Sequence, residues 1–168
     1  MNPTSRLIKI LTLNLLIIFV FYGNIKSDDK YTLDANGKVK VVAEHKYTEK
    51  HYFKNYIING TFEDNLGNYG FNETSVMAEY KEGKVIKLQW SGMLTYQNNK
   101  IIFARGIRKK GVDEAGVGRS ILFAGESPLN ILNNLECNYA IKFFKNNAFA
   151  KWVCNLSNTK LNILQNLD

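Results

Sequence analysis

Cysteine, histidine and proline are scarce in this chain of 168 residues, which contains two of each. The two cysteines, Cys137 and Cys154, form no C-x-x-C motif, and both histidines lie far from them in the sequence. A structural zinc site needs four ligands of these types, and a dithiol redox motif needs closely spaced cysteines. We therefore expect no metal site and no cysteine-based catalysis.

Motifs for nucleotide binding and nucleic-acid binding are also missing. The glycine-rich segment Gly111–Ser120 lacks the lysine that a phosphate-binding loop requires, and no Ser-His-Asp set or obvious carboxylate pair can be assigned. The formal net charge is +7, but lysine and arginine are spread along the chain rather than gathered into a basic stripe. The sequence therefore predicts no catalytic residue, no cofactor and no nucleic-acid partner, and it favours a binding protein over an enzyme.

The N-terminus has the pattern of a secretory leader. Arg6 and Lys9 precede or enter the apolar run 10–22. A positive segment followed by an apolar run of this length is typical of a signal peptide, whereas a membrane span needs roughly 20 apolar residues. Frequent asparagine and lysine are typical of an AT-rich genome, so we expect a bacterial protein that is secreted or periplasmic.

The leader also sets the predicted domain boundary. Cleavage after Ser27 gives a signal peptide over 1–27 and one domain over 28–168, which is an ordinary length for a single domain. Ile25 is not the small residue expected two positions before the cut, so an uncleaved N-terminal anchor is the alternative. In that case the leader is the protein's contact with a membrane.

The two cysteines lie in segments rich in aromatic and β-forming residues. If the loop between them spans 144–147, Phe143 pairs with Ala148 and Cys137 falls directly opposite Cys154. The apolar residues that then share their face are Tyr139, Ile141, Ala150 and Trp152. This alternation selects one register, because a shift by one residue would turn every side chain to the other face. The register predicts a disulfide, which an oxidising compartment permits.

The rest of the domain repeats a pattern of short strands and tight turns. A loop at 81–83 predicts a hairpin in which Ile86, Leu88 and Trp90 share one buried face. Asn36-Gly37 predicts a turn, and Ser127 predicts the start of a short helix or helical turn within 126–136.

Seven or eight such strands predict an all-β fold. Sequential hairpins favour a small antiparallel up-and-down barrel of about eight strands with one short helical turn, because closure removes exposed sheet edges. A β-sandwich is the alternative architecture.

Aromatic residues and one charged loop are the candidate binding groups. A barrel of about eight strands can be filled by side chains or can hold one small ligand. The aromatic residues that could line such a site are Tyr80, Trp90, Tyr96, Tyr139 and Trp152. The charged residues that could ring the barrel mouth are Asp113, Glu114 and Arg119.

His45 and His51 are the two histidines. On a continuous strand they share a face with Glu49, and together these three form a partial set of metal ligands. They lie too far apart on such a strand to bind one ion, so we interpret them as surface residues.

The segment "VGRSILFAGESPLNILNNLECNYAI", residues 117–141, resembles part of the allene oxide cyclase and dirigent-type barrels, where a strand runs through glycine-rich turns into the next strand. The resemblance implies an exported eight-stranded antiparallel barrel. It assigns no catalytic residue.

Three functions fit these observations. The first is an exported, non-enzymatic small barrel that binds a small hydrophobic or sugar-like ligand, or an extracytoplasmic protein. The second is a barrel isomerase or cyclase acting on a hydrophobic small molecule, and the third is an extracellular inhibitor module. Fold alone does not choose between them.

Overall fold

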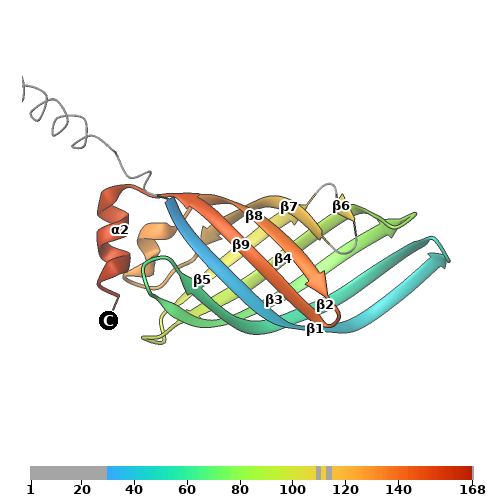
Figure 1. Ribbon diagram of the computed structural model, residues 1–168, viewed down its shortest axis with the longest axis horizontal. Coiled ribbons are helices and arrows are strands. Elements are labelled where there is room, and N and C mark those ends of the chain that lie inside the picture. Colours follow the sequence, from blue (N-terminus) through green and yellow to red (C-terminus); the bar gives the residue numbers. More distant parts are fainter. Residues whose placement is uncertain (1–29, 109–110, 113–114, 168) are drawn as a thin grey trace, which may run out of the picture.

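The computed structural model describes residues 30–108, 111–112 and 115–167, which form a closed antiparallel β-barrel (Figure 1). The strands are β1 (Lys30–Thr48), β2 (His51–Asp64), β3 (Tyr69–Lys81), β4 (Lys84–Tyr96), β5 (Ile101–Arg108), β6 (Gly111–Val112), β7 (Ala115–Phe123), β8 (Leu135–Phe144) and β9 (Asn147–Asn155). A 3-10 turn, η1 (Leu129–Leu132), and a helix, α2 (Asn158–Gln165), complete the described fold.

Eight of the strands form the barrel wall in chain order, each antiparallel to its neighbours. The short strand β6 pairs in addition with β4 and β7. The first and last strands close the barrel, with Lys30 opposite Asn155 and Lys38 opposite Asn147. The predicted up-and-down barrel of about eight strands is confirmed, and the sandwich alternative is wrong.

The final hairpin has the predicted register. Cys137 lies opposite Cys154, and Phe143 lies opposite Ala148. The two cysteines form a disulfide with their Cα atoms 4.4 Å apart. Both cysteines are buried on the apolar inward face of β8 and β9. Asn138 and its outward neighbours on the other face are exposed.

The predicted face of β4 is wrong at one position. The turn between β3 and β4 is followed by a bulge, so that Tyr80 pairs with Val85 and Glu79 pairs with Lys87. The extra residue reverses the alternation, which places Val85 in the core and leaves Ile86 45% exposed. Leu88 is buried as predicted.

Asn36 and Gly37 form no turn, contrary to the prediction. Both lie inside β1, where Gly37 pairs with Gly60 of β2. A Cβ atom on Gly60 would overlap the carbonyl oxygen of Asn36, so the two strands approach too closely here for a side chain. Gly37 and Gly60 therefore allow β1 and β2 to approach closely at this point of the barrel wall.

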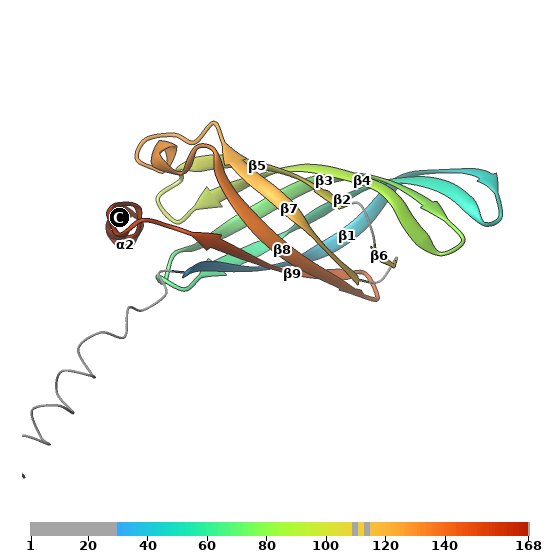
Figure 2. The same ribbon diagram turned by 90° about the horizontal axis from the view of Figure 1, so that it is seen from above.

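The two histidines do not share a continuous strand. The chain reverses at Glu49 and Lys50, which puts His45 on β1 and His51 on β2. His51 contacts Glu79 of β3, with Nε2 2.8 Å from a carboxylate oxygen. This hairpin extends beyond the barrel at its open end (Figures 1 and 2).

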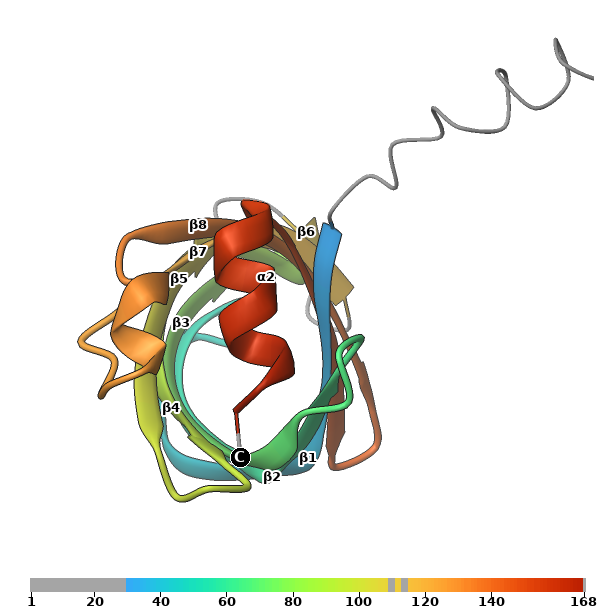
Figure 3. The same cartoon turned by 90° about the vertical axis from the view of Figure 1, so that its left-hand side faces the viewer.

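Helix α2 crosses the other end of the barrel (Figure 3). Its Leu164 is fully buried, and Asn68 and Asn98 donate hydrogen bonds from their side chains to the backbone oxygens of Leu164 and Leu167. This helix was not predicted from the sequence. Neither helical segment of the described chain has the length and apolar character that a membrane-crossing helix requires.

The predicted helical turn is present as η1, but it is shorter than 126–136. Ser127 does not cap it, since the turn begins after Pro128 without a capping side chain. Leu129 and Leu132 are fully buried, so η1 and α2 together close this end.

A buried polar cluster supports the capped end. The Tyr31 hydroxyl lies 3.0 Å from both Asp64 and the Tyr96 hydroxyl, and Asn68 donates to Asp64 from its side chain. Burial raises the pKa of both tyrosines well above the usual range. Both hydroxyls therefore stay protonated and serve as hydrogen-bond groups within the core.

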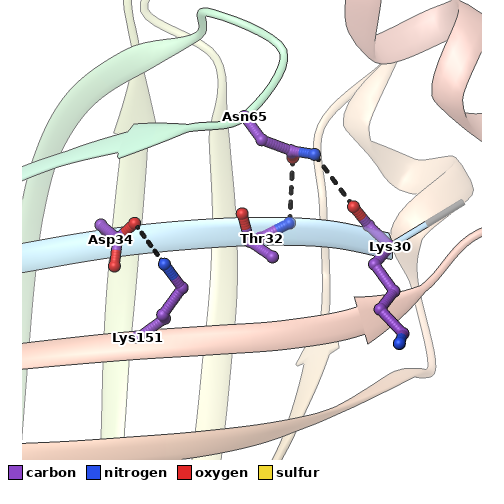
Figure 4. Close-up of polar contacts among 5 residues, drawn as sticks. All are labelled: Lys30, Thr32, Asp34, Asn65 and Lys151. Carbon is purple, nitrogen blue, oxygen red and sulfur yellow. Dashed lines mark hydrogen bonds and ion pairs between the residues drawn. The ribbon is translucent and has the colours of Figure 1, made fainter. Parts of the chain in front are cut away.

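The turn between β2 and β3 fixes the start of β1 (Figure 4). The side chain of Asn65 accepts a hydrogen bond from the backbone N–H of Thr32 and donates one to the carbonyl oxygen of Lys30, each 2.9 Å long. Lys151 and Asp34 form an exposed ion pair of 3.0 Å between β9 and β1. Exposed pairs contribute little, so at the start of β1 the Asn65 side chain adds more to the backbone pairing of the strand than this ion pair does.

Candidate functional site

Three of the predicted aromatic residues meet inside the barrel. Trp90 of β4 packs edge-on against Tyr139 of β8 and Trp152 of β9, with ring centroids 5.5 and 6.1 Å apart. Trp90 and Tyr139 are buried, and Trp152 is half-buried. Strands distant in the sequence therefore form one aromatic cluster between the capped and the open ends.

Glycines on the neighbouring strands make room for this cluster, since Gly106 is paired with Trp90 and Gly118 with Tyr139. A Cβ atom on Gly106 of β5 would lie 2.5 Å from the Trp90 indole, and one on Gly118 of β7 would lie 2.6 Å from the Tyr139 ring. Gly116 provides the same space for the side chain of Arg108. The large side chains fit because β5 and β7 have no inward side chains at these points.

Polar atoms lie among these apolar walls. Within the described residues, the Asn72 amide oxygen, the Trp90 indole nitrogen and the Tyr139 hydroxyl have no hydrogen-bond partner of good geometry. All three atoms are buried, and Arg108, which is 1% exposed, adds a positive charge to the interior. Buried polar atoms usually have partners, so a cluster of three such atoms requires an explanation.

The hydroxyl of Tyr139 is a hydrogen-bond donor at neutral pH. Burial raises the pKa of Tyr139, although the nearby Trp90 N–H and the charge of Arg108 partly offset this effect. The neutral phenol can therefore donate to an oxygen atom, and the Trp90 N–H can do the same.

The space around the polar atoms is small. The interior cavity beside Asn72, Trp90 and Tyr139 has a volume of about 40 Å³. A water molecule needs at least about 10–15 Å³ of such space, so the cavity fits a few waters or one small head group. A larger molecule must extend beyond it.

The barrel mouth provides that additional space. A cleft of about 420 Å³ opens between the β1–β2 and β8–β9 hairpins. Tyr56 and Phe143 line both this cleft and the interior cavity, and their rings lie 6.1 Å apart edge to face. Tyr80 stacks on Tyr52 at the same mouth. The cleft combines these aromatic rings with Lys54 and Lys145, and the neighbouring interior cavity has apolar walls that contain a few buried polar atoms.

The remaining predicted site residues lie elsewhere. Tyr96 is in the polar cluster of the capped end, and Arg119 is exposed on the outer face of β7. Asp113 and Glu114 lie outside the described residues. Residues 30–108, 111–112 and 115–167 contain no group of three or more metal-binding side chains.

Asn72 and Arg108 are interior residues that were not predicted from the sequence. Asn72 precedes Thr74 and Val76 at a spacing of two on β3, and Arg108 follows Ala104 and Gly106 in the same way on β5. If the alternation of inward and outward residues had been continued through polar positions, it would have placed both side chains inside the barrel.

The geometry therefore defines a candidate binding site with a few buried polar atoms at its apolar inner end and a mouth of aromatic rings and lysines. Comparison of the chain with protein-family models, with curated proteins and with solved structures finds no match.

Proposed function

We propose that the protein is a non-enzymatic binder of a small amphipathic molecule with an oxygen-bearing head group. The observation that carries this proposal is the set of buried polar atoms on Asn72, Trp90 and Tyr139 beside a cavity that opens toward an aromatic mouth. Ligand sites in proteins combine apolar walls with a few convergent polar groups in this way.

The polar atoms select the head group. Trp90 and Tyr139 offer donors and Arg108 adds a positive charge, which together outweigh the single acceptor, the Asn72 amide oxygen, so an anionic or neutral oxygen group is favoured over an ammonium group. The apolar part of the ligand then lies at the mouth beside Tyr56 and Phe143. Trp90 is buried beside both neighbouring rings, which leaves little open ring face for a stacked sugar.

Fluorescence offers a direct test, because Trp90 and Trp152 are the two tryptophans of the chain and both lie in this cluster. We expect a saturable change in fluorescence on titration with dodecanoate, and a much weaker response to dodecylammonium. The variant Tyr139→Phe should bind dodecanoate about tenfold more weakly, since it loses a hydrogen bond to a charged group.

The matched control is Tyr69→Phe, which removes the same hydroxyl from an exposed position outside the barrel. It should leave dodecanoate binding unchanged. No response to dodecanoate, dodecanol or dodecylammonium would contradict ligand binding. That result would favour a protein partner, for which the exposed Val42 and Tyr47 on the projecting β1–β2 hairpin are the supporting observation.

Action outside the cytoplasm is part of the proposal. The disulfide between Cys137 and Cys154 is compatible with export, because oxidising compartments maintain such bonds. The predicted leader, residues 1–27, lies outside the described residues. Intact-mass measurement on protein purified from its native cells is expected to show a chain beginning near Asp28. A retained Met1 in the membrane fraction would instead support an anchor.

A further inference from the structure

Charged side chains are unevenly distributed between the two ends of the barrel. At the open end the β1–β2, β3–β4 and β8–β9 hairpins turn, and the first two project beyond the rest of the barrel (Figures 1 and 2). Exposed lysines lie in or beside these turns and are here called the basic rim: Lys46, Lys50, Lys81, Lys84 and Lys145. The acidic residues at the same end are Glu44, Glu49, Glu79 and Glu82.

Two of these acids already have basic partners. One carboxylate oxygen of Glu44 lies 3.7 Å from Nζ of Lys46, and the other lies 3.8 Å from Nζ of Lys54. Glu79 is the partner of His51. Further positive charge at this end comes from Lys40, Lys87, Arg108 and Lys142. The described part of the open end is therefore positive overall.

The capped end has the opposite balance of charge. It carries the acids Glu63, Asp64, Glu126 and Glu136 and the lysines Lys30, Lys100 and Lys160. The barrel is therefore polarised along its axis, and a negatively charged surface would attract its open end first.

Large apolar side chains are exposed among the lysines of the open end. On the β1–β2 hairpin Val42 is 62% and Tyr47 65% exposed, and on the β8–β9 hairpin Phe144 is 65% exposed. Nζ of Lys145 lies 5.5 Å from the centre of the Phe144 ring, and both residues line the mouth cleft. Positive charge and exposed apolar groups therefore occur together around the mouth.

This combination fits the surface of an anionic lipid bilayer. Protein interfaces are depleted in lysine, which makes the basic rim a poor match for a protein partner. On a bilayer, ammonium groups contact anionic head groups while apolar groups enter the boundary between head groups and acyl chains. The long apolar stems of lysine can lie in the same boundary with their charges in water, and tyrosine is enriched at this depth.

We propose that the open end of the barrel binds the surface of an anionic bilayer through the basic rim and the exposed side chains of Val42, Tyr47 and Phe144. The mouth cleft lies between the β1–β2 and β8–β9 hairpins, so it faces the lipid in this orientation. The inference is carried by the charge and exposure of the hairpins and does not rest on ligand binding in the interior cavity.

Co-sedimentation of the full chain with lipid vesicles tests the electrostatic part. The protein should sediment with vesicles of phosphatidylglycerol and phosphatidylcholine, and it should be released at about 0.5 M salt, where exposed charges are screened. Lys50→Gln with Lys145→Gln should weaken this binding at least about tenfold, because each lysine near an anionic surface contributes a factor of roughly five. The control pair Lys100→Gln with Lys160→Gln removes the same charge from the capped end and should have no effect.

Fluorescence quenching tests the apolar part without changing any charge. In vesicles whose acyl chains carry bromine, a tryptophan placed by Tyr47→Trp should be quenched on binding. The control Tyr69→Trp replaces an equally exposed tyrosine, 61% exposed at the capped end, and should not be quenched. Tyr47→Ser should weaken vesicle binding and Tyr69→Ser should not.

Three results would overturn the proposal. The first is no sedimentation with phosphatidylglycerol vesicles, which would leave a protein partner for the exposed hairpins. The second is binding that persists in high salt and in the Lys50→Gln with Lys145→Gln variant, since the N-terminal leader would then be the contact. The third is equal weakening by the capped-end control pair, because binding would then follow net charge alone. The response to dodecanoate is measured without vesicles, so its failure leaves this test unaffected.

Discussion

Replacing Trp90 with alanine is expected to lower the free energy of unfolding by about 3–5 kcal/mol. The indole is buried, packs against Tyr139 and Trp152, and occupies the space beside Gly106. Its removal leaves a cavity at the centre of the barrel that these neighbours cannot fill without moving their backbones. Urea unfolding followed by far-UV circular dichroism measures the change.

The β4 bulge provides a control for this experiment. Ile86 is 45% exposed, so Ile86→Ala should cost less than about 1 kcal/mol, while Val85→Ala should cost more because Val85 is buried. If Ile86→Ala were the more damaging of the two, the bulge would be wrongly placed. A loss below about 1 kcal/mol for Trp90→Ala would show that the aromatic cluster is not core.

Loss of the disulfide is expected to lower the free energy of unfolding by about 3 kcal/mol. Cys137 and Cys154 are 17 residues apart in the sequence, and the bond joins the last two strands next to the point where β9 pairs with β1. The rest of the core is independent of this bond, so the reduced protein should remain folded with a lower melting temperature.

Thermal unfolding with and without reductant measures this effect, and a double Cys→Ser variant at the two positions provides the matched comparison without reductant. Peptide mapping of the untreated protein should recover one linked pair of fragments containing Cys137 and Cys154. Two free thiols in freshly isolated protein would contradict the bond, and an unchanged melting temperature would show that it contributes nothing to stability.

The sequence predicted the last hairpin well because two independent constraints agreed there. The alternation of apolar residues selected one register, and the same register placed the only two cysteines of the chain opposite each other. No second constraint was available for β4, where the bulge beside Val85 changed the alternation within one hairpin. The turn predicted at Asn36-Gly37 was wrong for a similar reason. The turn preference of this dipeptide is local, whereas its close approach to Gly60 depends on a second strand, β2.

The candidate site was only partly predictable. Trp90, Tyr139 and Trp152 were found because aromatic residues on inward faces of a barrel converge once it closes. Tyr80 and Tyr96 are also inward, but the length of the barrel separates them, and a period of two carries no information on depth along a strand. Arg108 was missed because a charged residue at the end of a strand normally lies in solvent.

The pairing of the first strand with the last has a consequence for how the chain acquires its fold. Lys30 finds its partner Asn155 only after almost the whole chain has been synthesised, so β1 has one open edge until then. Closure therefore depends on contacts between residues distant in sequence, which makes folding slow relative to that of proteins with local contacts. Until closure, β1 therefore keeps a row of backbone N–H and C=O groups without partners, and this edge is the part of the incomplete barrel most open to pairing with another chain.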